Sequence, residues 1–197
     1  MESERGQFIA LIHAIRRRGW SPATGGNFSL VLSRNPLRLL ITPSGIDKGD
    51  IAARDLLEID REGRCIGANG QPSAEALLHI PIVEERKATC VLHVHTVWNT
   101  LASLRGKSID IEGLEMLKAL SGLSSHLDHE RIPILPNSQD MPALSAELRS
   151  VLRTYPNCHG VLLAGHGLYT WGDSPSDAYR HLEALEFLLE VFVRRST

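Results

Sequence analysis

Two histidines separated by one residue end an apolar run in CVLHVHT, residues 90–96. In a β-strand, side chains alternate between the two faces of the sheet, so we expect His93 and His95 to project together and Cys90 to project from the opposite face. Two neighbouring imidazoles can bind one metal ion, at about 2.0–2.1 Å each for zinc. Two half-exposed surface histidines would have the same spacing, so the pair alone leaves both interpretations open.

A third histidine, His166, stands between Gly165 and Gly167 directly after the apolar segment VLLA. Flanking glycines let the backbone bend sharply and let a ligand approach closely. Histidines at two strand ends fit a three-histidine zinc site with an open position, which is typical of catalytic zinc. We therefore expect one Zn²⁺ ion at His93, His95 and His166, in preference to a purely structural zinc site.

The other histidines are expected to have different roles. Three lie in segments of helical character, where surface or capping roles are typical: His13, His79 and His181. Two form a weak H-x-x-H pattern in the polar loop SSHLDHE: His126 and His129. His159 precedes a strand, and we expect it to be structural.

Two glutamates are candidates for acid–base chemistry. Glu75 follows Ser73 in the first turn of an expected helix. Glu115 lies among apolar residues in IEGLEMLKAL, which would desolvate it and raise its pKa toward a useful range. Taken singly, either residue could instead be a surface charge or interact with a helix dipole.

Two Gly-rich turns and one helix start offer the small residues, hydroxyls and free backbone N–H groups of an anion-binding site. Neither TGGNFS (24–29) nor TPSG (42–45) has the spacing of a known nucleotide-binding loop. Beside a metal site, they predict a small phosphorylated substrate. The expected phosphate contacts are Thr24, Gly25, Gly26, Asn27, Thr42, Ser44, Gly45 and Ser73.

Composition limits the possible partners and surroundings. The 197 residues suit one domain, 1–197, and the net charge of −2 gives no electrostatic reason for a nucleic acid or membrane partner. No apolar run approaches the length of a membrane span, and MESERGQF does not resemble a signal peptide. Three widely spaced cysteines do not suggest a disulfide framework, so we expect a cytoplasmic protein.

Helices and strands are expected to alternate along the chain and to form one α/β domain. Helical patterns cover residues 4–18, 71–86, 113–121, 141–156 and 174–193, and the last has Ser174 as N-cap and Pro175 at its first position. Ser73 is expected to cap the second helix. Extended segments are expected within 21–33, 37–45, 56–60, 88–96, 131–137 and 159–172.

The segments TGGNFS, ITPSG, PSAE, HVHT and AGHG resemble, in order and spacing, those of the class II aldolase/adducin family over nearly the whole chain. The resemblance implies a single-domain α/β/α sandwich with a central, mostly antiparallel sheet. It also implies a homotetramer with one zinc ion per subunit, held near a subunit boundary by three histidines. These correspond to His93, His95 and His166.

Three further segments resemble the family's dehydratases of methionine salvage, which act on a methylthio-substituted ketose phosphate: IEGLEMLKAL, IPILPNSQDMPALSAEL and HGLYTWGDSPSDAYRHLEALEFLLE. This resemblance implies that Glu115 is the acid/base residue, whereas the family's sugar-phosphate aldolases use a glutamate that corresponds to Glu75. We expect zinc to polarise the ketose carbonyl while a carboxylate, Glu115 first, removes a proton from carbon. The absence of a longer tail after the last helix favours the dehydratase.

Two alternatives remain open. One is a zinc aldolase or epimerase acting on a short sugar phosphate of the fuculose or ribulose type. The other is a non-catalytic binding module like the adducin head, which the three retained histidines disfavour.

Overall fold

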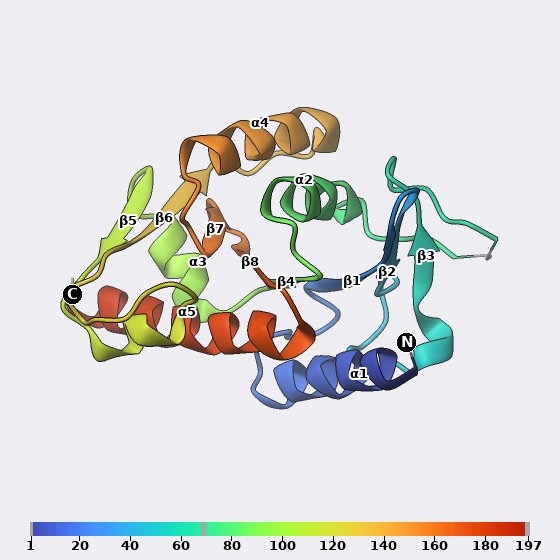
Figure 1. Cartoon of the computed structure of the whole chain (residues 1–197), viewed down its shortest axis with the longest axis horizontal. Helices are drawn as coiled ribbons and strands as arrows, with labels where there is room; N and C mark the ends of the chain where they lie inside the picture. Colours follow the sequence, from blue (N-terminus) through green and yellow to red (C-terminus); the bar gives the residue numbers. More distant parts are fainter. Residues whose placement is uncertain (1, 68–69, 196–197) are drawn as a thin grey trace.

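The strands form one twisted sheet that lies between two layers of helices (Figure 1). This computed structural model describes residues 2–67 and 70–195. The helices are α1 (Glu2–Arg17), α2 (Ala76–Arg86), α3 (Val97–Ser103), α4 (Met141–Thr154) and α5 (Pro175–Arg195), with the 3₁₀ helices η1 (Ala53–Asp55) and η2 (Glu115–Ala119). The strands are β1 (Asn27–Arg34), β2 (Leu37–Ile41), β3 (Leu57–Ile59), β4 (Cys90–Val94), β5 (Ser108–Ile111), β6 (Glu130–Leu135), β7 (Gly160–Leu163) and β8 (Gly167–Gly172).

The strand order is β3-β2-β1-β4-β8-β7-β6-β5. Neighbouring strands pair antiparallel, except for β6 and β7, which are parallel because α4 connects them. The expected α/β/α sandwich with a central, mostly antiparallel sheet is therefore confirmed. Within the described residues, no helix has the length and apolar character to cross a membrane.

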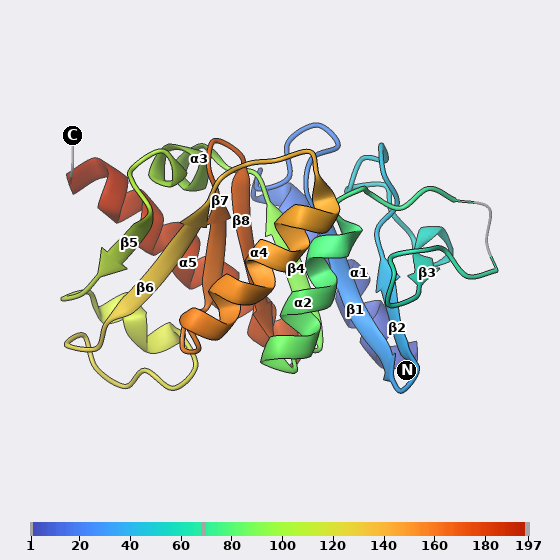
Figure 2. The same cartoon turned by 90° about the horizontal axis from the view of Figure 1, so that it is seen from above.

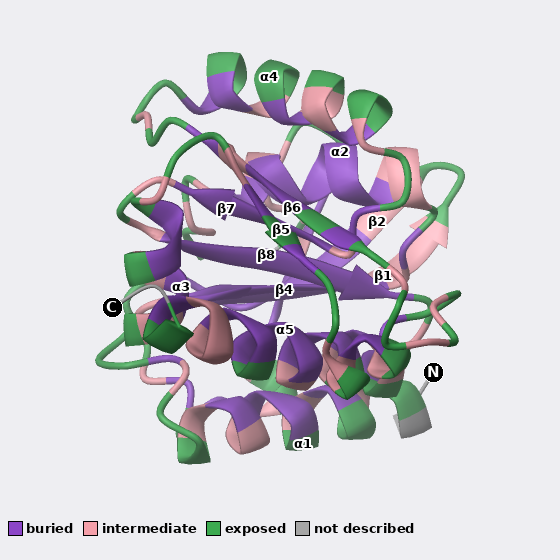
Figure 3. Cartoon of the chain, turned by 90° about the vertical axis from the view of Figure 1, so that its left-hand side faces the viewer, coloured by how far each residue is buried: buried purple, intermediate pink, exposed green. Residues whose placement is uncertain are grey.

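Each face of the sheet has its own hydrophobic core, as the burial colouring shows (Figure 3). Helices α1 and α5 cover one face, where Phe8 and Leu185 pack with Leu92 of β4. Helices α2 and α4 lie side by side across the other face (Figure 2), where Leu78 packs with Val91 of β4. Neighbouring residues of β4 thus belong to opposite cores, as strand alternation requires.

Several helix boundaries differ from expectation. Helix α2 begins only at Ala76 with Glu75 as its N-cap, so Ser73 lies in the preceding turn and does not cap it. The segment 113–121 contains the 3₁₀ helix η2 and no α-helix. At α5, the Asp177 backbone N–H donates to Ser174 Oγ at 3.1 Å, so the predicted cap is confirmed.

The three cysteines are free, in agreement with the prediction that the chain has no disulfide framework.

Candidate metal centre

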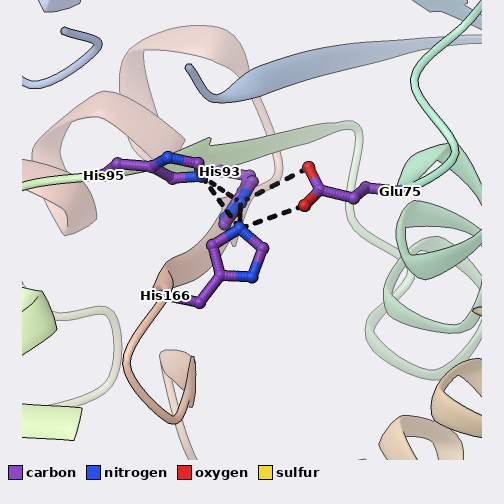
Figure 4. Close-up of side chains that lie close together, drawn as sticks. All are labelled: Glu75, His93, His95 and His166. Atoms are coloured by element: carbon purple, nitrogen blue, oxygen red, sulfur yellow. Dashed lines mark hydrogen bonds and ion pairs between the residues drawn. The ribbon is translucent and has the colours of Figure 1, made fainter. Parts of the chain in front are cut away.

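Three histidines and one glutamate converge at one end of the central strands (Figure 4). His93 is the next-to-last residue of β4, and His95 lies just beyond the strand end. Because β4 and β8 are antiparallel, the turn before β8 brings His166 beside them. Glu75 arrives from the start of α2.

The side-chain atoms of this cluster are arranged as metal ligands would be. The Nε2 atoms are 2.8 Å apart between His93 and His95, 3.1 Å between His95 and His166, and 3.3 Å between His93 and His166. In a tetrahedral zinc site with bonds of about 2.0–2.1 Å, neighbouring ligand atoms are about 3.3 Å apart. The four candidate ligand atoms lie within 4.8 Å of one another. Imidazole nitrogens with one carboxylate fit a divalent metal of the zinc type.

Hydrogen bonds orient two of the rings. His93 Nδ1 donates to the Leu168 carbonyl at 3.1 Å, and His166 Nδ1 donates to Asn137 Oδ1 at 3.3 Å. Each bond leaves the Nε2 lone pair directed at the cluster. The fully buried His93 ring also stacks on Tyr169, with ring centroids 3.9 Å apart. Burial lowers the pKa of His93 well below its usual value and also lowers that of His95, which favours the neutral, metal-binding form.

Three glycines make room for these histidines. A Cβ on Gly25 would lie 3.0 Å from His95 Nδ1, and one on Gly26, where φ is +77°, would lie 2.5 Å from the His93 carbonyl oxygen. A Cβ on Gly167 would lie within 3.0 Å of both rings. Gly25 and Gly26, predicted only as phosphate contacts, therefore also allow the histidines to pack.

Glu75 is held as an anion. Its Oε1 is 3.0 Å from His166 Nε2 and its Oε2 is 3.6 Å from His93 Nε2, while Asn27 Nδ2 donates to Oε2 at 2.5 Å. Burial alone would raise the pKa of Glu75, but the two histidines and the Asn27 amide lower it to about 2. A carboxylate is thus present at the centre across the neutral pH range.

A buried chain of hydrogen bonds supports this carboxylate from behind. His79 Nε2 donates to Asn27 Oδ1 at 2.5 Å, so its Nδ1 accepts from Ser29 Oγ at 2.7 Å. His79 is fully buried, and burial lowers its pKa to about 3. The expectation of a surface or capping role for His79 is wrong, because this side of α2 faces the sheet.

Glu115 does not join the cluster. Its side chain is 70% exposed and accepts a hydrogen bond from Lys118 Nζ at 2.5 Å, which lowers its pKa. The expected desolvation is wrong, because Leu117 turns into the core while Glu115 stays on the outer side of η2.

The chain path explains the separation of Glu115 from the cluster. Strand β7 runs toward His166, β6 is parallel to it, and β5 is antiparallel to β6. The C-terminal end of β5 therefore lies at the end of the sheet opposite His166, and η2 follows it there.

The other histidines lie apart from the cluster. His181 is buried and donates from Nδ1 to the Trp171 carbonyl at 2.7 Å, so its expected surface or capping role is wrong. His13 is half-buried and bonds to the Ile51 carbonyl rather than capping a helix. His159 pairs with buried Glu130, consistent with a structural role.

Most of the predicted phosphate contacts surround one cavity of about 340 Å³ that reaches the metal centre. Its lining residues from the prediction are Thr24, Gly25, Gly26, Asn27, Ser44, Gly45 and Ser73. Thr42 lies behind the cavity wall, fully buried, and its Oγ1 accepts from the Phe28 backbone N–H at 3.1 Å. Glu75 and His95 lie on the wall nearest the cluster.

The cavity also has lining residues that the sequence did not indicate, among them Lys48, Gln139 and Met141. Gln139 and Met141 come from the connection between β6 and α4, which only the tertiary fold brings to the cavity. Lys48 follows the TPSG turn by three residues. This closeness to a proposed anion site is the one feature of the sequence that could have indicated Lys48 as a lining residue.

Comparison with known proteins identifies relatives over nearly the whole length of the chain. Residues 6–193 match the family model of the class II aldolase and adducin N-terminal domain. The chain is 42% identical over 193 residues to a methylthioribulose-1-phosphate dehydratase of Yersinia enterocolitica, covering 96% of this chain and 91% of the relative. It is 40% identical over 195 residues to a protein of the same name from Methylococcus capsulatus, covering 98% and 94%.

Solved structures share the fold at lower sequence identity. An L-fuculose-1-phosphate aldolase from Thermus thermophilus superposes with a TM-score of 0.79 at 22% identity, covering 100% of this chain and 97% of that one. A sugar-phosphate aldolase from Thermotoga maritima superposes with a TM-score of 0.71 at 20% identity, covering 98% and 95%. At these identities the likeness concerns the fold alone.

Proposed function

Because the chain belongs to the class II aldolase and adducin family, we propose that it is a hydro-lyase that dehydrates 5-methylthioribulose 1-phosphate. The product is 2,3-diketo-5-methylthiopentyl 1-phosphate. Identity of 40–42% over nearly the full length of dehydratases of that name carries the choice of substrate. The convergence of three imidazoles and a carboxylate beside a cavity supports the chemistry.

The ligand set favours one Zn²⁺ per subunit at His93, His95 and His166. A bound divalent metal supplies Lewis-acid polarisation of the substrate carbonyl at C2. The phosphate group would lie against the cavity wall formed by Thr24 to Asn27, Ser44, Gly45 and Ser73. This arrangement fixes the substrate at an end remote from the carbons that react.

Within its own chain, we propose Glu75 as the base that takes the proton from C3, and its position in the cluster supports this role. Its carboxylate is ionised and directed at the point where the three Nε2 atoms converge. The electron pair left at C3 forms a C3–C4 double bond, and the C4 hydroxyl leaves with a proton as water. The resulting enol becomes the diketone when its hydroxyl proton is lost and C4 gains a proton.

In its own chain, Glu115 lies at the opposite end of the sheet from His166. We therefore propose that Glu115 acts as an acid/base residue at the metal centre of a neighbouring copy, within a homotetramer. Co-expression of His93→Ala and Glu115→Gln chains tests it, because mixed assemblies contain sites with both groups intact. Activity that neither parent possesses supports the role, whereas wild-type activity of Glu115→Gln alone contradicts it.

A zinc aldolase or epimerase acting on a short sugar phosphate is the second candidate, favoured by Glu75 at the centre and by the shared fold of sugar-phosphate aldolases. Incubation of the purified, zinc-loaded protein with 5-methylthioribulose 1-phosphate and with L-fuculose 1-phosphate separates the two. We expect the diketone from the first and no dihydroxyacetone phosphate from the second. The opposite result would refute the proposed dehydration.

Metal analysis tests the alternative that this protein is a binding module without catalytic activity. We expect about one zinc ion per subunit, held by the three histidines with one position left open for the substrate. We place the reaction in methionine salvage in the cytoplasm.

A further inference from the structure

One lysine is buried in the wall of the cavity. The Lys48 side chain is 1% exposed, and its Nζ donates to the Thr24 carbonyl at 3.0 Å and to the Ile46 carbonyl at 2.9 Å. Thr24 belongs to the first Gly-rich turn and Ile46 directly follows the second. Lys48 therefore ties together the two turns that line the cavity.

The Lys48 ammonium has no direct ion-pair partner in the part of the chain that the structure describes. Among the described residues, no Asp or Glu oxygen forms an ion pair with its Nζ. The charge of the adjacent Asp47 partly opposes the lowering of the Lys48 pKa, but both Asp47 oxygens already accept from Arg16 at 2.8 Å. Glu75, on the same cavity wall, is engaged by the metal-centre histidines.

A buried ammonium without a counter-ion is costly unless a ligand supplies the negative charge. Burial lowers the pKa of Lys48, which records this cost. An ammonium has three N–H donors, and the two carbonyls use two of them, which leaves one for a ligand.

The rest of the cavity has the chemistry of a phosphate site but lacks another permanent cation. Lys48 is the sole Lys or Arg among its described lining residues. The other lining residues on that side offer the hydroxyls of Ser44 and Ser73 and the backbone N–H of Gly45, whereas the Ser44 backbone N–H already donates to the Gln71 carbonyl at 3.2 Å. These groups donate hydrogen bonds to an anion, but they do not balance its charge.

We propose that Lys48 is the cation that binds the substrate phosphate, and that it makes the protein select phosphorylated over unphosphorylated ketoses. The identity of the ketose rests on the proposed function, whereas binding of a phosphate dianion at Lys48 does not. The buried position explains why one lysine suffices: charge-assisted hydrogen bonds are stronger away from water.

Titration of the zinc-loaded protein with inorganic phosphate, followed by calorimetry, tests the proposal. We compare Lys48→Met, which keeps the length of the stem, with Lys107→Met, which removes an exposed lysine outside the cavity. We expect Lys48→Met to weaken phosphate binding by about 10- to 100-fold. The KM for the phosphorylated substrate should rise by a similar factor while kcat changes little, and Lys107→Met should match the wild type.

A second variant separates charge from local structure. Lys48→Gln keeps a donor for the carbonyls without the charge, so we expect it to fold and still to lose phosphate affinity. Retention of wild-type affinity by Lys48→Gln or Lys48→Met would overturn the proposal. If neither variant folds, ¹⁵N NMR of the wild-type lysine ammonium groups decides: phosphate must shift the Lys48 signal and leave Lys107 unmoved, and an unmoved Lys48 signal overturns the proposal.

The outcomes also distinguish this inference from the proposed function. Phosphate binding that depends on Lys48, without dehydration of the methylthio substrate, upholds the inference and rejects the function. Dehydration of the methylthio substrate with an unchanged KM in Lys48→Met upholds the function and rejects the inference.

Discussion

Two groups of histidines lie at opposite ends of strands β7 and β8. The metal centre lies where the turn between these strands carries His166, and the second group, His159 and His181, lies at their other end. The rings pack at similar distances, with centroids 4.6 Å apart for His95 and His166 and 5.1 Å apart for His159 and His181. Ring packing therefore does not distinguish a metal centre from a structural cluster.

The partners of the ring nitrogens do distinguish them. In the second group, His159 bonds through Nδ1 to Glu130 Oε2 and through Nε2 to the Ser121 carbonyl, both at 2.8 Å. His181 Nε2 accepts from the Ser121 backbone N–H at 3.1 Å, and its Nδ1 donates to the Trp171 carbonyl. Each of these nitrogens has a partner within the chain, so the group has no ring nitrogen left for a metal.

In the metal centre, by contrast, three Nε2 atoms face one another. Neutral imidazole acceptors at such distances repel unless a proton or a metal ion lies between them. The difference between the two groups is therefore that the ring nitrogens of the second are bonded to separate groups of the chain, whereas those of the first are directed at one common point.

The largest expected effect comes from replacing one histidine of each group in separate variants. His166→Ala should lose the bound divalent metal and at least about 1000-fold in dehydration rate, because several kcal/mol of carbonyl polarisation disappear. His159→Gln, in the second group, should keep both zinc and rate and lose only thermal stability. Elemental analysis, the dehydration assay and thermal unfolding measure the contrast. Loss of zinc from His159→Gln would remove the distinction between the groups.

Removal of the carboxylate from the second group should reduce stability alone. Glu130 is buried, and Glu130→Gln should lower the free energy of unfolding by about 3 kcal/mol. Glu62→Gln, in an exposed ion pair with Arg64, should cost less than about 1 kcal/mol.

The effect of Glu130→Gln should also depend on pH. Burial would lower the pKa of His159, but the hydrogen bond and charge of Glu130 raise it overall. The extra stability is therefore fully present below the usual histidine pKa and is lost as the pH rises through the folded-state value. Urea unfolding at pH 5.5 and pH 8.5 should show the larger cost at the lower pH. A cost independent of pH would show that the pair does not titrate as described.

A buried glutamate near the metal centre should behave differently, because its partners are neutral. Burial raises the pKa of Glu186 to about 7, against hydrogen bonds from Thr96 and Asn99, and the charge of Glu190 adds to the rise. The native state binds the extra proton, so this stabilisation is present below the unfolded pKa of 4.5 and is lost as the pH rises through 7.

Glu186→Gln should therefore flatten the pH dependence of stability. A rise in pKa from 4.5 to about 7 corresponds to roughly 2–3 kcal/mol between pH 4.5 and pH 8. The variant should match or exceed the wild type in unfolding free energy at pH 8. An unchanged slope with pH would contradict the raised pKa.

The smallest expected effect concerns the helix that carries His181. Ser174→Ala removes the acceptor for the Asp177 backbone N–H at the start of α5 and should cost about 1 kcal/mol. Ser124→Ala, at an exposed loop position, is the control and should cost nothing measurable. Thermal unfolding measures both variants, and zinc content should not change in either. A loss of bound metal in Ser174→Ala would show that the stability of the second histidine group affects metal binding by the first.

Local rules were enough to predict several features from the sequence. Strand alternation placed His93 and His95 on one face, and the Ser174 cap depended only on residues within one helical turn. Alternating apolar patterns predicted only an α/β domain, and the family resemblance implied the α/β/α architecture. These features involve neighbours in the chain, whose geometry the backbone itself imposes.

Packing between distant segments decided the rest. Neither the exposure of Glu115 nor the burial of His79 could be read from flanking residues, because each depends on which side of its helix faces a neighbouring element. The sequence by itself determined that three histidines are available at strand ends. Only the tertiary structure decided that Glu75 meets all three and that Asn27 and Lys48 line a cavity with Glu75 and His95, because such contacts depend on how the sheet and helices pack.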